Sequence, residues 1–317
     1  MRSMVSQYLD QPQTSKQTIE ALSPTLSAVC CSMQGWRIAM EDAHILNLSL
    51  EEDAQLLAVF DGHGGKDISV FLGRHFAGEL LNSAKYQHGD YEGALKDTYM
   101  LMDELLLSDA GVKERYSIYK GQREVYANDL ALARRELPVA GSTAVVALLK
   151  QGHLWVANAG DSRCMLISAG RAIELTHDHK PSVPTELFRI KAAGGTVQEN
   201  RVNGVLNLTR SIGDFEYKGN PKLPLERQMI IAQPEVVTKR LEREDEYLVL
   251  ACDGVWDMWN SQDLAGFIRE QTAQGMGLRT VAEEACNRCL SANPMLSEGC
   301  GGDNVTLILV RLAGSNQ

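Results

Sequence analysis

Apolar residues along the chain occur in two arrangements, as short uninterrupted runs and at helically spaced positions. Short runs rich in Val, Leu and Ile are typical of strands buried within a sheet. From these runs we predict strands at residues 27–33, 44–50, 56–60, 143–149, 154–159, 163–168, 247–252 and 305–310. The strands between 143 and 168 are joined by short glycine-containing turns, which indicate an antiparallel meander.

Helical spacing separates these strands into groups. Apolar residues recur at intervals of three and four, the pattern of one helix face, in residues 68–81, 91–107, 123–136 and 184–193. A helix capped by Asn260 and a last helix before Gly301 follow. Strands in runs with helical pairs between them predict an α+β fold, an antiparallel β-sandwich flanked by pairs of α-helices in α-β-β-α layers.

Polar segments are expected to lie outside this core. Residues 1–22 are predicted to be an irregular or loosely attached N-terminal segment. Residues 108–122 are predicted to form a surface connection, and the long polar excursion 203–227 a surface flap. Because no linker, low-complexity run or internal repeat divides the chain, we expect residues 23–317 to form a single domain.

The composition is that of an ordinary globular protein, with 44% hydrophobic and 23% charged residues. A net charge of −10 argues against a nucleic-acid partner, which would require a basic stripe. We expect no membrane association, because no apolar segment is long enough to span a bilayer and neither a signal peptide nor an N-terminal Met-Gly is present. Seven scattered cysteines indicate reduced thiols. We therefore expect a cytoplasmic monomer, with the nucleus as a second location.

Residues 56–65 are the most informative stretch of the sequence. Their apolar run ends at Asp61, and three of the next four residues are glycine. Asp61-Gly62 alone is a strong hairpin-turn signal, but a hairpin needs a second strand, and helical spacing begins at Ile68 instead. Strand, acidic glycine loop and helix is thus the better interpretation. A carboxylate and the free Gly62 carbonyl at a strand end are hard oxygen ligands that suit Mg²⁺ or Mn²⁺.

An aspartate beside a glycine recurs at the borders of apolar strands. The pairs are Asp61-Gly62, Gly160-Asp161, Asp253-Gly254 and Gly302-Asp303. Each pair alone is compatible with a turn or a satisfied loop acid. If the four strand ends converge on one edge of a sandwich, they form an all-oxygen cage for a pair of hard divalent ions.

Two basic residues near these acids have alternative interpretations. Arg37 forms either a weak surface ion pair with Glu41 or a guanidinium fork that grips phosphate oxygens. His63 is either an idle loop histidine or, with its cationic form stabilised by carboxylates, a proton donor near neutral pH. Cys286 and Cys289 have a suggestive spacing, but they lie in a helical pattern without a second pair and are expected to be buried apolar residues.

Taken together, these motifs resemble those of the metal-dependent protein serine/threonine phosphatases, the PPM or type 2C family. The resemblance runs from about Met33 to Val310. Its motifs are Gly35-Trp36-Arg37, Met40-Glu41-Asp42-Ala43-His44, Val59-Phe60-Asp61-Gly62-His63-Gly64-Gly65, Gly141-Ser142-Thr143-Ala144, Asn158-Ala159-Gly160-Asp161-Ser162-Arg163, Asp178-His179-Lys180-Pro181, Leu208-Thr209-Arg210-Ser211-Ile212-Gly213-Asp214, Cys252-Asp253-Gly254-Val255-Trp256-Asp257 and Asp303-Asn304. Residues 108–139 and 297–302 do not follow the family pattern closely, which leaves substrate choice open.

The resemblance implies a binuclear Mg²⁺ or Mn²⁺ centre at one end of the sandwich. Asp61 would bridge both metals, and Asp253 and Asp303 would ligate the first. The Gly62 carbonyl, and Glu41 through water, would serve the second metal. Asp161 and Asp257 match acids that hold a weaker third metal, together with Asp253, in some members.

The resemblance also implies the remaining roles and the reaction. Arg37 matches the phosphate-binding arginine and His63 the proposed general acid, while residues 181–218 fall where the family carries its substrate-side flap. The expected activity is hydrolysis of phosphoserine and phosphothreonine in protein substrates, by direct attack of a water shared by the two metals. One rival is a catalytically weak pseudophosphatase that acts as a phosphoprotein-binding module. Another is hydrolysis of small phosphate metabolites.

Overall fold

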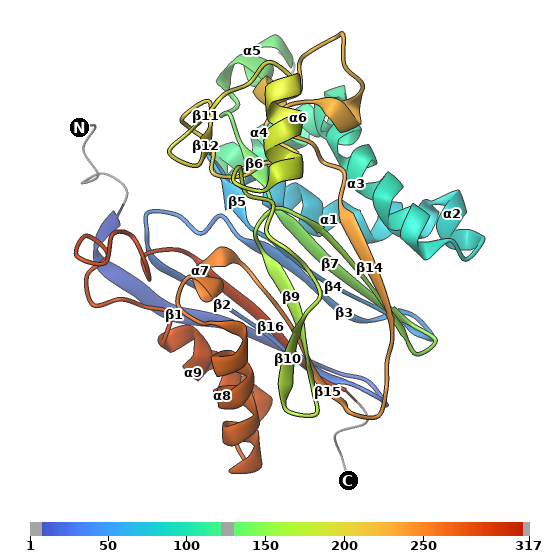
Figure 1. The fold of residues 1–317 in the computed structure, drawn as a ribbon, viewed down its shortest axis with the longest axis vertical. Helices are drawn as coiled ribbons and strands as arrows, with labels where there is room; N and C mark the ends of the chain where they lie inside the picture. The colour runs from blue at the N-terminus through green and yellow to red at the C-terminus, as the bar shows by residue number, and fades with distance from the viewer. Residues whose placement is uncertain (1–7, 122–129, 313–317) are drawn as a thin grey trace.

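The computed structural model describes residues 8–121 and 130–312 of the chain. Two antiparallel sheets pack face to face, and helices cover the outer face of each sheet (Figure 1). Helices α1 (Asp67–Asn82) and α3 (Tyr91–Leu107) lie on one side. Helices α8 (Ser261–Ala273) and α9 (Leu278–Asn287) lie on the other. The four layers confirm the predicted α+β sandwich.

The two large sheets differ in the order of their strands. The six-stranded sheet runs in the order β1 (Tyr8–Leu22), β2 (Ser27–Arg37), β16 (Val305–Arg311), β15 (Asp245–Ala251), β9 (Arg163–Ser168) and β10 (Arg171–Glu174). The five-stranded sheet runs β14 (Glu235–Arg240), β8 (His153–Ala159), β7 (Ala144–Lys150), β4 (Ala54–Phe60) and β3 (Ala43–Glu51). A small sheet at the upper end in Figure 1 joins β13 (Ile212–Gly213), β6 (Gly141–Ser142) and β5 (Gly62–His63).

Strand β4 is buried on both faces, which explains its uninterrupted apolar run. Leu57 and Val59 belong to the core between the two sheets. Leu56 and Phe60 point the other way, into the core under the helices. Phe60 lies against Phe76 of α1 with ring centroids 5.9 Å apart. A strand held from both sides is a rigid support for the residue that follows it, Asp61.

The N-terminal segment differs from the expectation. Residues 8–22 are not irregular but form β1, which pairs along its length with β2. The strand is at the edge of its sheet, and most of its side chains are exposed or half-buried, so a polar sequence suffices. Contacts with α9 also hold β1: the Thr18 hydroxyl donates to Glu283 at 2.8 Å, and the Arg279 guanidinium pairs with Glu20 at 2.6 Å.

The predicted connection at 108–122 is a helix instead, α4 (Asp109–Lys120). The apolar pattern did not predict α4 because the helix has few apolar residues. Its buried face includes Arg115, whose Nε donates to the Asp67 carboxylate of α1 at 2.9 Å. The predicted helix 123–136 is observed as α5 (Leu130–Glu136), and residues 122–129 lie outside the described residues. Two short helices, α2 (Ala84–Gln87) and α7 (Asp253–Trp256), also lie outside residues 181–234. Among the described residues, none of the helices combines the length and apolarity that spanning a bilayer requires.

The predicted meander is correct only for its first two strands. β7 and β8 pair, but β9 belongs to the opposite sheet, where it pairs with β15 and β10. The chain crosses between the sheets at Gly160 and Asp161. Gly160 has φ +125°, and a Cβ there would lie 2.6 Å from Thr143, so only glycine fits this crossing. The crossing leaves Asp161 at the end of the sandwich.

Residues 181–234 form a flap outside the two large sheets, beside β5 and β6 in Figure 1. It contains α6 (Pro184–Ala192), the β11 (Val197–Gln198) and β12 (Arg201–Val202) hairpin, and a small core of its own. Buried Glu186 of α6 pairs with Arg189 and Arg210 at 2.7 Å each. Burial alone would raise the pKa of Glu186, but the two guanidinium groups outweigh it and lower the pKa to about 2.

We predict that Glu186→Gln destabilises the protein most at neutral pH and less in acid. The folded-state pKa of Glu186 lies below its ordinary value of 4.5. Its stabilisation is therefore fully present above pH ~4.5 and is lost as the pH falls towards the folded value. Breaking a buried ion pair costs about 3 kcal/mol. Urea unfolding at pH 7 and at pH 3.5 measures the difference from wild type, with exposed Glu226→Gln as the control. An equal difference at both pH values would contradict the assignment.

Candidate active site

The predicted acids meet at one end of the sandwich because of how the strands pair. β16 lies between β2 and β15, with Val305 opposite Met33 and Leu307 opposite Ala251. Asp303, just before β16, is thereby set beside the loop that leaves β2 and beside Asp253, which follows β15. Asp61 ends the rigid strand β4 in the facing sheet. Glu41 and Asp42 lie between β2 and β3.

Glycines bring these loops into backbone contact. A Cβ on Gly62 would lie 2.4 Å from the Glu41 carbonyl oxygen, and one on Gly35 would lie 2.5 Å from that of Asp303. A Cβ on Gly254 would lie 2.0 Å from the carbonyl oxygen of Asn304. No other residue type fits at such a distance, so these glycines set how closely the acidic loops approach each other.

The side chain of Asn304 holds the loop that carries Glu41. Its Oδ1 accepts the Glu41 amide at 2.9 Å, and its Nδ2 donates to the carbonyls of Gln34 and Ala39 at 2.8 and 3.0 Å. The side chain is buried and uses both ends of its amide. Asn304 therefore fixes the backbone on which Arg37 and Glu41 stand.

The carboxylates at this end repel one another. Burial, followed by the charges of Asp253 and Asp42, raises the pKa of Asp61 well above its ordinary value. Burial, followed by the charges of Asp161 and Asp303, does the same to the pKa of Asp253. Burial is also the main reason why the pKa of Glu41 is raised. Within the described residues no cation pairs directly with Asp61 or Asp253, a setting that favours a bound cation.

Two cationic side chains reach the acids. Arg37 pairs with Asp303 at 2.6 Å rather than with Glu41, so it is not an i,i+4 surface pair. Its side chain is 40% exposed, and its Nε has no hydrogen-bond partner among residues 8–121 and 130–312. Lys180 bonds the buried carboxylate of Asp161 through its ammonium group. Each cation thus serves one acid, and no ion pair to Asp61 or Asp253 is found in the described part of the chain.

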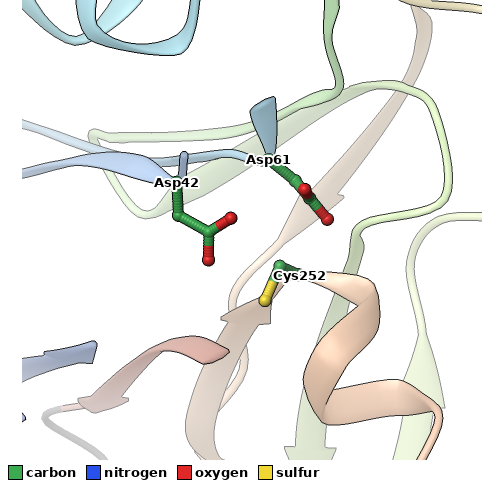
Figure 2. Close-up of side chains that lie close together, drawn as sticks. All are labelled: Asp42, Asp61 and Cys252. Carbon is green, nitrogen blue, oxygen red and sulfur yellow. The ribbon is translucent and has the colours of Figure 1, made fainter. Parts of the chain in front are cut away.

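The tightest cluster of ligating atoms differs from the predicted set. In the described part of the chain, Asp42, Asp61 and Cys252 form the one group of at least three such residues whose ligating atoms lie within 4.8 Å of one another (Figure 2). Burial raises the pKa of Asp42 to about 7 and that of the Cys252 thiol well above its ordinary value. A protonated thiol is a poor ligand for a hard cation. Asp42 accepts from the Thr306 hydroxyl at 2.6 Å, so we interpret Asp42 and Cys252 as support behind Asp61.

The other predicted residues lie around this group. Asp257 is exposed just beyond α7. His63 is next to Gly62, and its Nε2 lies 2.8 Å from Oδ2 of Asp214. Burial lowers the pKa of His63, but the charge and hydrogen bond of Asp214 outweigh burial, so the pKa is raised overall. The structure therefore brings an acidic cluster, a partly exposed arginine and a carboxylate-bound histidine to one end of the sandwich.

A family model described as Protein phosphatase 2C matches residues 27–295. The chain belongs to the protein phosphatase 2C family. It is 39% identical over 304 residues to "Probable protein phosphatase 2C 6" of Paramecium tetraurelia, covering 96% of this chain and 98% of the relative. It is 40% identical over 327 residues to "Probable protein phosphatase 2C 60" of Arabidopsis thaliana, covering 96% and 91%.

Solved structures of related proteins share the fold. A phosphatase from Toxoplasma gondii superposes with a TM-score of 0.73 at 24% identity, covering 95% of this chain and 96% of that one. A sex-determining protein of C. elegans superposes with a TM-score of 0.67 at 27% identity, covering 92% and 66%. The family membership confirms the predicted metal-dependent protein serine/threonine phosphatase and does not favour the pseudophosphatase.

Sequence reasoning missed two residues of this phosphatase site, Asn304 and Asp214. The sequence shows Asn304 only as the neighbour of Asp303, because its contacts depend on which backbone groups reach it. Gly213-Asp214 repeats the Gly-Asp pattern of Gly160-Asp161, which is a usable signal. Asp214 nevertheless lies in the predicted flap rather than beside a long apolar strand, so the sequence assigns it no role of its own.

We predict that Gly254→Ala disrupts the phosphatase, because the new methyl group would overlap the Asn304 carbonyl oxygen. Forcing the two loops apart should cost about 2 kcal/mol or more in the free energy of unfolding. Gly266→Ala on α8 is the matched control, since a Cβ there meets nothing within 4 Å. In a helix interior that change stabilises by about 0.5–1 kcal/mol. Thermal melting measures the stability of both variants. A Gly254→Ala enzyme as stable as wild type would contradict the prediction.

Proposed function

We propose that this phosphatase acts on phosphoserine and phosphothreonine in proteins with two Mg²⁺ or Mn²⁺ ions bound at the acidic end of the sandwich. Asp61 would serve both ions, and Asp253 and Asp303 the first. The Gly62 carbonyl and, through water, Glu41 would serve the second. The observation that carries the proposal is the convergence of the loops that bear Glu41, Asp61, Asp253 and Asp303: Gly62 lies against the Glu41 carbonyl, and Gly254 lies against Asn304. Burial beside other acids raises the pKa of Asp61 and Asp253 in agreement with it.

The donor set fits hard divalent cations. The predicted ligands offer only carboxylate and carbonyl oxygens, the donors that Mg²⁺ and Mn²⁺ prefer. The glycine at position 62 lets the backbone come close, since a Cβ would collide with the Glu41 carbonyl oxygen. When bound, a pair of such ions supplies Lewis-acid stabilisation of phosphoryl oxygens and lowers the pKa of a water molecule.

A third, weaker site would use Asp161 and Asp257 together with Asp253. The Lys180 ammonium bonds Asp161 and lowers the repulsion felt by Asp253 and Asp257. A third ion would therefore compete with the Lys180 ammonium group for the carboxylate of Asp161. This competition supports the expectation that the third site is the weakest.

Arg37 and His63 would act on the substrate itself. Arg37 has guanidinium donors left over from its bond to Asp303, and these can grip the phosphate oxygens. In the reaction, water adds to phosphorus and the bond from phosphorus to the serine or threonine oxygen breaks. His63 gives a proton to the departing oxygen. One proton of the attacking water stays on the phosphate product, and the other passes to solvent, from which His63 regains its proton.

The flap beside this site supports protein substrates. It places exposed Phe188 and Val205 on the surface and is braced by the buried Glu186 ion pairs. Small phosphate metabolites would not need such a surface. All seven cysteines are free thiols and only Cys300 is exposed, which agrees with a reducing compartment, cytoplasm or nucleus. The protein is proposed to act as a monomer.

We predict that Asp61→Asn and Asp253→Asn each reduce metal-dependent phosphate release from a phosphothreonine peptide by roughly a hundredfold or more, because the ligand charge is lost. The assay uses Mn²⁺, with EDTA as the blank. Near-wild-type rates in excess Mn²⁺ would contradict the assignment. Sugar phosphates, assayed in parallel, test the metabolite alternative.

The same variants have a stability readout that does not depend on turnover. In EDTA, Asp253→Asn should melt higher than wild type because it removes one repelling charge from the cluster. Mn²⁺ should raise the melting temperature of wild type and raise that of the variant much less. Equal shifts in both proteins would place the metal elsewhere.

We predict that His63→Gln slows hydrolysis mainly for poor leaving groups. A serine or threonine oxygen needs a proton as it departs, so the rate on a phosphopeptide should fall by roughly a hundredfold. p-Nitrophenolate is a much better leaving group and should lose far less. Steady-state rates on the two substrates test this, and equal losses would remove the acid role.

A further inference from the structure

Asp214 is the one side chain that hydrogen-bonds the imidazole of His63 within the described part of the chain. The bond joins His63 Nε2 and Asp214 Oδ2 at 2.8 Å. Asp214 is 2% exposed, and Nδ1 of His63 has no hydrogen-bond partner in the described residues. The histidine therefore has one nitrogen held by the protein and one left for another molecule.

The Asp214 carboxylate is itself held from several directions. The Ser211 hydroxyl donates to the same Oδ2 at 2.5 Å, and the Asp214 amide donates to the Ala140 carbonyl at 3.0 Å. Asp214 has φ +49° and follows Gly213 at φ +87°. An aspartate in this region is uncommon and marks a conformation that its surroundings impose.

Gly141 makes room for the pair. A Cβ at this position would lie 2.2 Å from Asp214 Oδ2 and 2.6 Å from His63 Nε2. Gly141 pairs with His63 across β6 and β5 and with Gly213 across β6 and β13. The small sheet thus sets the acid and the imidazole side by side.

The loop that carries Asp214 is tied to helix α3. Asp103 accepts the Gly213 amide at 2.8 Å and the Lys218 ammonium at 2.6 Å. Lys218 also donates to the Ser211 carbonyl at 2.8 Å. These half-buried bonds fix the loop on both sides of Asp214.

The chemistry of the pair determines which nitrogen carries the proton. A carboxylate can only accept hydrogen bonds, and it already accepts one from Ser211. His63 must therefore carry a hydrogen on Nε2 and donate it to Asp214. The second nitrogen, Nδ1, is then the one that exchanges a proton with the substrate.

We propose that Asp214 is a positioning residue that holds His63 with Nε2–H directed to its carboxylate and Nδ1 available to the leaving oxygen. The inference rests on the acid role of His63 in the proposed function. It gives loop 211–218 of the flap a part in positioning His63, in addition to substrate contacts.

The kinetic test compares Asp214→Asn with wild type on a phosphothreonine peptide and on p-nitrophenyl phosphate, in saturating Mn²⁺. An amide can present either donor or acceptor to Nε2, so the imidazole loses its imposed orientation. We expect kcat on the peptide to fall roughly tenfold or more, with a loss below about threefold on p-nitrophenyl phosphate. Asp109→Asn, an exposed acid on α4, is the control and should change neither rate.

A double mutant separates positioning from general damage. If Asp214 acts through His63, Asp214→Asn should add no more than about a twofold loss in a His63→Gln background. Equal losses on both substrates, or losses that multiply in the double mutant, would overturn the inference. A wild type that releases phosphate from neither substrate would instead end the proposed function.

A spectroscopic test is independent of turnover. Long-range ¹H–¹⁵N spectra of the wild-type enzyme report which nitrogen of neutral His63 is protonated. We expect the Nε2–H form in wild type and a mixture in Asp214→Asn. Observation of the Nδ1–H form in wild type would overturn the proposal even if Asp214→Asn fails to fold. Ser211→Ala, which removes the other donor to Asp214, serves as a milder variant on the same readouts.

Discussion

Repulsion between carboxylates gathered at one end of the sandwich is the constraint on which the rest of the structure depends. The pKa values of Asp61 and Asp253 are raised because both groups are buried beside other acids. Such a cluster would push mobile loops apart. It persists because its members stand at the ends of strands that are buried on both faces, as β4 is. Burial of the large apolar core thus offsets the electrostatic repulsion between the carboxylates of the site.

Backbone contacts between loops hold the cluster together. Gly62 and Gly254 each press against the backbone of another acidic loop, and the amide of Asn304 ties the Glu41 loop to β16. None of these contacts needs a metal ion. The acidic loops are therefore held together by contacts within the protein.

The histidine proposed to donate the proton is held by different elements. The acids lie at the ends of strands of the large sheets. His63 is held through Asp214 by the small sheet of β5, β6 and β13 and by loop 211–218 of the flap. Asp103 and Lys218 connect that loop to α3. Changes in the flap can therefore reach the leaving-group side of the reaction without disturbing the predicted metal ligands.

The amino-acid pattern was enough to predict the layers and the acidic loops that meet at one end of the sandwich. Uninterrupted apolar runs predicted β4, β15 and β16, and the Asp-Gly pairs at their ends predicted which acids converge, because both signals are local. It did not reveal β1 or α4, whose polar residues become ordered only by pairing with β2 or by packing Arg115 on Asp67. Nor did it show that β9 crosses to the other sheet at Gly160. These features and the contacts of Asn304 and Asp214 arise only in the folded chain, since each depends on partners far away in the sequence.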